Sequence, residues 1–367
     1  MSTPPLTAAE VAPGLEPVAH VFTTLLESGR ELGAALSVHR GGRELLSVSG
    51  GWSDTARTSP FTPATLVQVF SAGKPIAAAA ALTAVADGIL TLDDPIGRWW
   101  PEYAAAGKQS TTLRHLLSHR AGLPGFSTAA ATIDALDRDA LIADLVAAAP
   151  VAPPGEVIAE HALTYGHLIE GLLAAAGAPD ARSAAARLGE LTGSELRFGV
   201  PPAEQHRVAD LEILDATWVD RYLARDDTRH LLETPTGHLD PARLNTAVWR
   251  AASLPASGLF TTATSLARFY DDLHRPDGAI AGRLGSRLHA EYLSPQAVGH
   301  DLFIDGPVEW SLGLRVDDGE IGMGGIGGSC AWYSPAHDYS FAFVTRSLAH
   351  FDRVDALADA LESALAA

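Results

Sequence analysis

The sequence predicts an α/β (α+β) protein in which an antiparallel sheet is flanked by helices and carries an inserted all-helical subdomain. Near both ends of the chain, alternating apolar stretches surround turn-forming residues, which is typical of β-hairpins. A stretch with helical spacing stands outside each hairpin. The middle of the chain is rich in Ala and Leu, with helical periods interrupted by Pro and Gly. Such a chain can close one antiparallel sheet with its terminal helices packed on a face.

The first elements are a helix over residues 18–26 and two strands over residues 33–39 and 43–49. Arg40-Gly41-Gly42 separates the strands, and its glycines permit the positive φ angles of a tight hairpin. The pattern returns near the C-terminus. Strands are expected over residues 329–333 and 339–344, around a turn, and a helix over residues 354–365.

Between about Leu90 and Leu232, helical patterns such as 141–148 and 168–176 dominate. We therefore assign residues 1–89 and 240–367 to a discontinuous sheet domain. Residues 90–239 are assigned to a mostly helical subdomain. The length of 367 residues fits two domains, or one large domain with an insertion.

Composition narrows the classes of function. The chain has 26 Lys+Arg against 44 Asp+Glu, a net charge of −18, and 47% hydrophobic residues, which indicates a globular protein with a large core. This charge repels phosphate backbones and anionic lipid, so we expect no nucleic-acid partner and no membrane partner. The oligomeric state is left open.

Cys330 is the one cysteine, so an internal disulfide and a thiolate zinc site are excluded. The first residues lack the basic and apolar regions of a secretory signal. The longest apolar stretch, residues 75–86, is well short of the roughly 20 residues that a membrane-spanning helix needs. We expect a cytoplasmic protein.

The most informative stretch runs from Val69 to Ile76 and contains Ser71 and Lys74. We expect a helix to start at or just after Ser71, because Pro75 is tolerated in a first helical turn. Residues three apart share a helix face, so Lys74 is expected beside Ser71. The backbone N–H of a serine there can donate to a developing oxyanion, and a neutral lysine can accept the serine proton.

With these residues the chain resembles the serine β-lactamase-related family of class C β-lactamases, D-Ala-D-Ala carboxypeptidases and esterases, closest to its intracellular esterase-like branch. The matching segments cover most of the length. They are Gly50-Gly51-Trp52, residues 69–74, 90–95, 99–102, 113–119, 121–124, 254–258 and 324–329. The resemblance implies a β-lactamase/transpeptidase-like fold with the active site between sheet and helical subdomain.

Carried over residue by residue, the resemblance makes Ser71 the acyl-forming nucleophile and Lys74 its partner. The family has a tyrosine where this chain has Glu160, followed by His161, which we place in the substrate cleft. The family's second oxyanion donor corresponds to the N–H of Ile326, beside that of Ser71.

The family's third motif, a strand with His or Lys and then glycines, reads here Met323, Gly324 and Gly325. The glycines would let substrate lie against the strand. Met323 removes a cation or donor, which favours an apolar acyl group and argues against efficient turnover of β-lactams with a free carboxylate. Trp310 is a further candidate for the acyl pocket.

Glu160 has two interpretations. A carboxylate near Lys74 favours the ammonium form of that lysine, which makes Glu160 the better candidate base. Alternatively, Glu160 only pairs with Lys74 in a site that has lost its chemistry. Tyr165 lies five residues on and is expected to be structural.

Other patterns carry no function here. His115 and His119 have a metal-compatible spacing, but the accompanying glutamate of a zinc motif is absent, so no metal site is expected. Cys330 is expected to be a small buried residue. No cofactor is implied.

Three functions follow from this reading. The first is a serine hydrolase that forms an acyl-enzyme on Ser71 from an ester or amide with a small to medium apolar acyl group. The second is an acyltransferase, amide-forming or cyclising enzyme on the same scaffold. The third is a catalytically degenerate binding protein.

Overall fold

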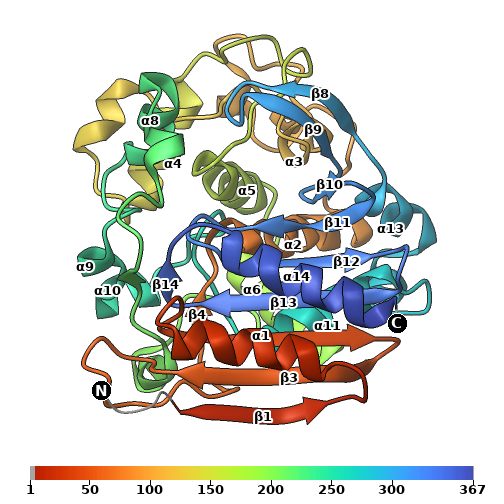
Figure 1. Cartoon of the computed structure of the whole chain (residues 1–367). Coiled ribbons are helices and arrows are strands. Elements are labelled where there is room, and N and C mark those ends of the chain that lie inside the picture. Colours follow the sequence, from red (N-terminus) through yellow and green to blue (C-terminus); the bar gives the residue numbers. More distant parts are fainter. Residues whose placement is uncertain (1–4, 367) are drawn as a thin grey trace.

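The computed structural model describes residues 5–366 and is built on a nine-stranded antiparallel sheet of order β1-β3-β2-β13-β12-β11-β10-β9-β8 (Figure 1). The strands are β1 (Leu6–Val11), β2 (Gly33–Arg40), β3 (Arg43–Gly51), β8 (Ala297–Asp301), β9 (Gly306–Trp310), β10 (Arg315–Asp317), β11 (Glu320–Gly324), β12 (Cys330–Ser334) and β13 (Tyr339–Thr345). Strand β2 pairs with its hairpin partner β3 and with the late strand β13. The expected fold class, an antiparallel sheet with flanking helices, is confirmed.

The remaining strands form two small sheets. One has the order β4 (Val67–Gln68), β7 (Leu259–Thr261) and β5 (Arg197–Phe198). The other pairs β14 (Ser347–Leu348) with β6 (Glu212–Ile213) in parallel. The first of them leads directly into the turn that carries Ser71.

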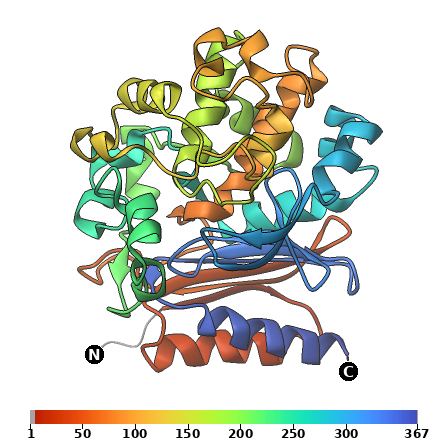
Figure 2. The same ribbon diagram turned by 90° about the horizontal axis from the view of Figure 1, so that it is seen from above.

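Helices α1 (Glu16–Glu27) and α14 (Asp352–Leu365) pack side by side on one face of the large sheet (Figure 2). Their buried residues, such as Phe22 and Leu357, meet the apolar side chains of β2, β3 and β13. In the β2–β3 hairpin, Gly41 and Gly42 have φ angles of 58° and 82°, which side chains resist. The expected terminal helices and both hairpins are therefore present.

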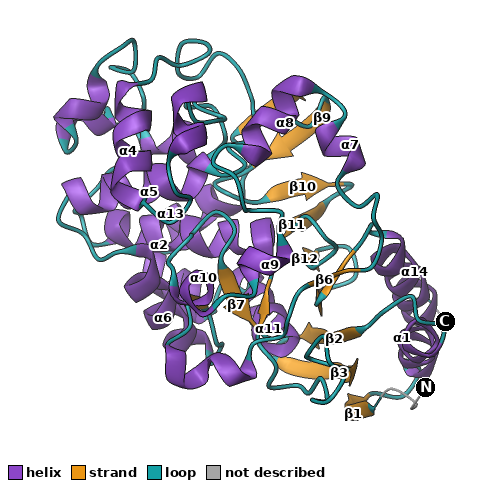
Figure 3. Ribbon diagram, turned by 90° about the vertical axis from the view of Figure 1, so that its left-hand side faces the viewer, coloured by secondary structure: helices purple, strands orange, loops and turns teal. Residues whose placement is uncertain are grey.

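The remaining helices cover the other face and one side of the sheet (Figure 3). They are α2 (Lys74–Ala86), α3 (Leu113–Leu117), α4 (Arg138–Ala147), α5 (Thr164–Ala175), α6 (Ala181–Thr192), α7 (Asp220–Leu223), α8 (Asp226–Glu233), α9 (Pro241–Leu244), α10 (Ala247–Ala251), α11 (Ala263–His274), α12 (Ala279–Leu284) and α13 (Ser286–Leu293). Between residues 90 and 239 the chain forms α3 to α8 with only the short strands β5 and β6.

Helix α2 is buried on nearly all sides, with Ala77 to Ala81 at most 1% exposed. Helices α5 and α6 pack against it, and α11 lies on β2 and β13. Alanines allow neighbouring helices to approach closely, so the start of α2 is held rigidly inside the protein. Within residues 5–366, no helix combines the length and the apolar character needed to cross a membrane.

Candidate active site

Ser71 lies on a 3₁₀ turn, η1 (Phe70–Gly73), and the α-helix α2 begins only at Lys74. We expected a helix to start at or just after Ser71; Ser71 lies in the 3₁₀ turn, and the α-helix follows from Lys74. The 3₁₀ turn opens at Phe70, whose φ of 50° is unusual for a residue with a side chain. Pro75 stands in the first turn of α2, as expected.

The Ser71 turn is held between two strands. The N–H of Val69 donates to the carbonyl of Leu259 in β7 at 2.9 Å. On the other side, Gly325, the residue after β11, lies very close to the turn. A Cβ atom at Gly325 would overlap the carbonyl oxygen of Val69. Gly325 is therefore required for the approach of strand to turn. The expectation that the glycines let substrate lie against the strand stays a prediction.

Lys74 joins Ser71 to Glu160. Its Nζ atom donates to Ser71 Oγ at 2.9 Å and to Glu160 Oε1 at 2.7 Å. Lys74 is fully buried and Glu160 is 7% exposed, while the Ser71 side is partly open. The structure thus brings together the three side chains singled out from the sequence, in a chain of hydrogen bonds that starts at a hydroxyl.

Backbone bonds to two side chains hold the segment that carries Glu160. The N–H of Glu160 donates to Asp301 Oδ1 at 3.2 Å, and the next N–H, of His161, donates to His119 Nδ1 at 3.1 Å. Because an amide donates to it, Nδ1 of His119 carries no proton. Burial lowers the pKa of His119 well below its usual value, and neighbouring His161 and Lys74 act in the same direction.

His161 does not reach the cavity, contrary to expectation. Its ring is fully buried, lies 5.6 Å from the His119 ring, and accepts the N–H of Leu123 on Nε2 at 3.4 Å. Burial lowers the pKa of His161 to about 3, so the ring is neutral at pH 7. The backbone turns this side chain inward while Glu160 faces the cavity, so His161 belongs to the wall behind the site.

His115 and His119 do not share a helix. Helix α3 ends at Leu117, and His119 follows with a φ of 61°. In residues 5–366, no three His, Cys, Asp or Glu side chains gather in a way that could hold a metal ion.

Two further backbone amides belong to residues that line the cavity. The loop after β11 is shaped by bonds from Gly325 N–H to the Ser329 carbonyl at 2.7 Å and from Gly328 N–H to the Gly325 carbonyl at 3.1 Å. Ile326 lies between them and lines the cavity. Across the described part of the chain, neither Ser71 N–H nor Ile326 N–H donates a hydrogen bond.

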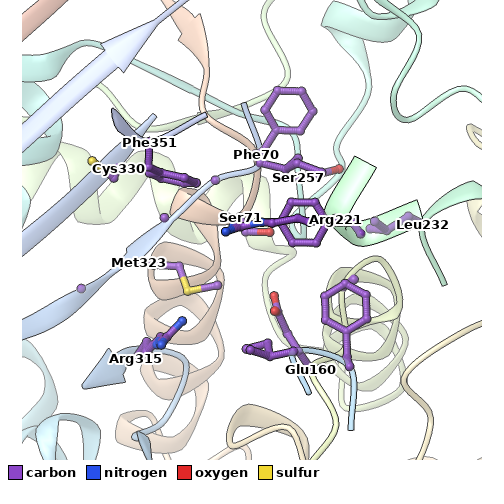
Figure 4. A pocket seen from close by; sticks show the side chains of 18 of the residues that line it. Phe70, Ser71, Glu160, Arg221, Leu232, Ser257, Arg315, Met323, Cys330 and Phe351 are labelled. Atoms are coloured by element: carbon purple, nitrogen blue, oxygen red, sulfur yellow. The ribbon is translucent and has the colours of Figure 1, made fainter. Parts of the chain in front are cut away.

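These groups open into a cavity of about 820 Å³. In Figure 4, Glu160 points toward Ser71, and Met323 projects from β11 beside them. Much of the wall is apolar: Phe70, Ala162, Leu163, Leu232, Leu239, Phe303, Ile304, Trp310, Met323 and Ile326. The charged residues Arg221, Arg225, Asp305 and Arg315 also border the cavity.

Met323, Gly324, Gly325 and Trp310, all expected at the substrate, are among the lining residues. The missing side chain of Gly324 faces the ring of Phe351, at 3.2 Å from where its Cβ would be. Trp310 is fully buried and donates its indole N–H to Asp301 Oδ2 at 3.2 Å.

Two residues weighed from the sequence lie apart from the reacting groups. Tyr165 is fully buried with its hydroxyl toward the carbonyl of Leu117 at 3.5 Å, and burial raises its pKa. Burial likewise raises the pKa of the Cys330 thiol, which borders the cavity from β12. Sequence reasoning missed Phe303, Ile304 and Asp301, because no motif marks them and they reach the site only through the fold.

Comparisons with known proteins show the family of the chain. The Beta-lactamase family model matches residues 18–365. The chain belongs to the Beta-lactamase family. It is 30% identical over 350 residues to the esterase/beta-lactamase LipL of Mycobacterium tuberculosis, covering 90% of this chain and 81% of that protein. The family is one of serine hydrolases, and this chain is an enzyme of that type.

Two solved structures superpose closely on the chain. A penicillin-binding protein homolog from Caulobacter crescentus has a TM-score of 0.83 and 28% identity, covering 98% of this chain and 100% of that one. A family VIII carboxylesterase has a TM-score of 0.85 at 23% identity, with 98% of this chain and 100% of the other covered. At 23% identity, the likeness to the carboxylesterase shows a shared fold.

Proposed function

We propose that this member of the Beta-lactamase family hydrolyses an ester or amide through an acyl-enzyme on Ser71. Ser71 Oγ attacks the carbonyl carbon of the substrate. Its proton passes to Lys74 Nζ as Lys74 releases a proton to Glu160 Oε1. The N–H groups of Ser71 and Ile326 receive the oxyanion, which preorganised amides stabilise strongly in a water-poor site.

The second half of the reaction returns the proton. When the carbon–oxygen or carbon–nitrogen bond breaks, the leaving group takes a proton back along the same path. Water then attacks the acyl carbon, gives its proton toward Glu160, and Ser71 Oγ regains a proton as the acid leaves. Glu160 thus acts as the base, with Lys74 as the group that connects it to the serine.

One observation carries this proposal: Lys74 Nζ is within hydrogen-bond distance of both Ser71 Oγ and Glu160 Oε1, at 2.9 and 2.7 Å, at the edge of a cavity. A base must lie within hydrogen-bond reach of the proton that it removes, directly or through one group. The pairing supports a working relay. In a degenerate site, Ser71 would have no reason to remain in that chain.

The cavity walls support an apolar acyl group. Phe303, Ile304, Trp310 and Met323 line the same cavity as Ser71, and position 323 has no lysine to attract a carboxylate. Ligand cavities of roughly 300–1,000 Å³ enclose a drug-sized molecule, so about 820 Å³ leaves room for a leaving group as well as the acyl group.

The test is labelling with a fluorophosphonate followed by intact mass, with turnover of a chromogenic short-chain ester measured in parallel. We expect one adduct on Ser71, no adduct in Ser71→Ala, and product release by the wild-type protein. Glu160→Gln should lower kcat by about 10²–10⁴-fold, as is usual for a positioned acid–base group. Unchanged turnover in Glu160→Gln would remove Glu160 from the mechanism.

The size of the cavity also favours a second candidate, acyl transfer to an alcohol or amine. The space continues from Ser71 past Gly324 to Phe351 and Arg221, where an acceptor other than water could lie. An adduct that clears only when an amine or alcohol is added would support transfer. The absence of any adduct would support a binding protein instead.

A further inference from the structure

Four N–H groups donate hydrogen bonds to the fully buried carboxylate of Asp301. At the end of β8, its Oδ1 atom accepts hydrogen bonds from the backbone N–H groups of Phe303 at 2.8 Å, Ile304 at 3.0 Å and Glu160 at 3.2 Å. Its Oδ2 atom accepts the indole N–H of Trp310 at 3.2 Å. Among the described residues, no cation lies within salt-bridge distance of Asp301.

The four residues that donate to Asp301 all line the cavity, whereas Asp301 itself does not. They come from three places in the chain: the segment before α5, the loop after β8, and β9. A buried charge without an ion pair is costly unless hydrogen bonds compensate it, so these donors and Asp301 depend on one another. The carboxylate therefore ties the segment of Glu160 to the apolar wall.

We propose that Asp301 is a positioning residue, which holds the base Glu160 and the acyl-pocket wall formed by Phe303, Ile304 and Trp310 as one unit. This inference rests on the proposed function, since it needs Glu160 as base. Asp301 donates no proton and touches no reacting atom. Its effect reaches the reaction through the position of the Glu160 carboxylate relative to Lys74.

The chemistry of the four bonds makes Asp301→Asn a sharp test. If the asparagine oxygen keeps the three backbone donors, its NH₂ group faces the indole N–H of Trp310, and two donors meet. If the amide turns over, the NH₂ group faces the N–H of Glu160 instead. We expect kcat for the ester to fall about 100-fold, because a displacement of 1 Å can cost this much.

A double-mutant cycle separates positioning from general damage. In the Glu160→Gln background, adding Asp301→Asn should lower kcat by less than about threefold, since residues that act as a unit are not additive. Adding Trp310→Phe to Asp301→Asn removes the second donor and should recover part of kcat. The double variant also tests the proposal if Asp301→Asn alone does not fold. Its kcat should remain below that of Trp310→Phe.

Asp271→Asn is the matched control. Asp271 is also buried and accepts a backbone N–H, from Gly42 at 2.6 Å, but it does not line the cavity. It should keep the wild-type kcat. The proposal would be overturned if Asp301→Asn kept the wild-type kcat per folded molecule. It would also be overturned if Asp301→Asn lowered kcat by the same factor in the wild-type and in the Glu160→Gln background. A failure of the base assignment shows separately, as full activity in Glu160→Gln alone.

Discussion

The carboxylate of Glu160 is the counter-charge of the buried ammonium group of Lys74, at a distance of 2.7 Å. Lys74 is fully buried, and its one other side-chain partner within residues 5–366 is the neutral hydroxyl of Ser71. Taking either charge away leaves the other without compensation in a site of low dielectric constant. The pair therefore links the stability of the protein to the groups proposed for its chemistry.

Lys74→Met and Glu160→Leu should each lower the free energy of unfolding by about 3–5 kcal/mol, the usual cost of breaking a buried ion pair from one side. The combined variant, with no charge left, should be more stable than either single variant while remaining inactive. Urea denaturation of the four proteins measures this. Single variants as stable as the wild type would contradict the burial of the pair.

Gly325→Ala should inactivate the enzyme, because the added methyl group would overlap the carbonyl oxygen of Val69 and displace the Ser71 turn. We expect a loss of about 100-fold in kcat/KM and about 1–3 kcal/mol in stability. Gly306→Ala is the control, since nothing lies within 4 Å of its would-be Cβ. Ester turnover and thermal unfolding of both variants decide the question, and equal behaviour would refute the tight contact.

Met323→Lys should shift the preference of the enzyme toward substrates with a free carboxylate. Met323 lines the cavity from β11, and a lysine there would offer a charge-assisted hydrogen bond worth about 1.5–3 kcal/mol. We expect kcat/KM for a carboxylate-bearing β-lactam to rise about tenfold relative to a neutral ester. Met323→Leu controls for packing, and the same ratio in both variants would argue against a role in selectivity.

Acidification should destabilise the protein through its buried histidines. Burial lowers the pKa of His167 to about 4, against about 6.5 for a free side chain. Between these values the unfolded chain binds a proton that the folded protein excludes, so stability falls as pH drops below about 6.5. Stability above that range is unaffected by this group.

His167→Phe should therefore make the decline shallower by roughly 1 kcal/mol per pH unit between pH 6 and 5. His274, whose pKa burial also lowers to about 4, should still contribute in the variant. Denaturant unfolding from pH 8 to pH 5 measures the slope for both proteins. The plots of unfolding free energy against pH should be parallel for the two proteins above pH 7 and diverge below it. Plots that stay parallel down to pH 5 would contradict the prediction.

The local elements could be predicted from the sequence because short-range signals determine them. Gly41 and Gly42 mark the first hairpin, and Pro75 marks the first turn of α2. The spacing of Ser71 and Lys74 was enough to bring their side chains together. Glu160 could be associated with them only through a family resemblance, since nothing local connects positions so far apart.

The remaining features depend on tertiary contacts. The left-handed backbone of Phe70 has no signal in its residue type, so the sequence does not predict the 3₁₀ turn. Asp301 lies 141 residues from Glu160, and the two come together beside an isolated bridge between Ile158 and Asp301. His161 follows Glu160 directly, yet its side chain enters the core, because the direction of a side chain in a loop does not follow from its position in the sequence.

The strand order also dictates when catalytic competence can arise during synthesis. Strand β2 lies beside β13, and the turn of Ser71 packs on the loop after β11. These early segments therefore cannot complete their contacts until the late segments have been synthesised. Closing such long loops slows folding. A nascent polypeptide that stops short of Gly325 would carry the serine and its lysine without Ile326, whose N–H is the proposed oxyanion donor, and we expect it to be inert toward esters.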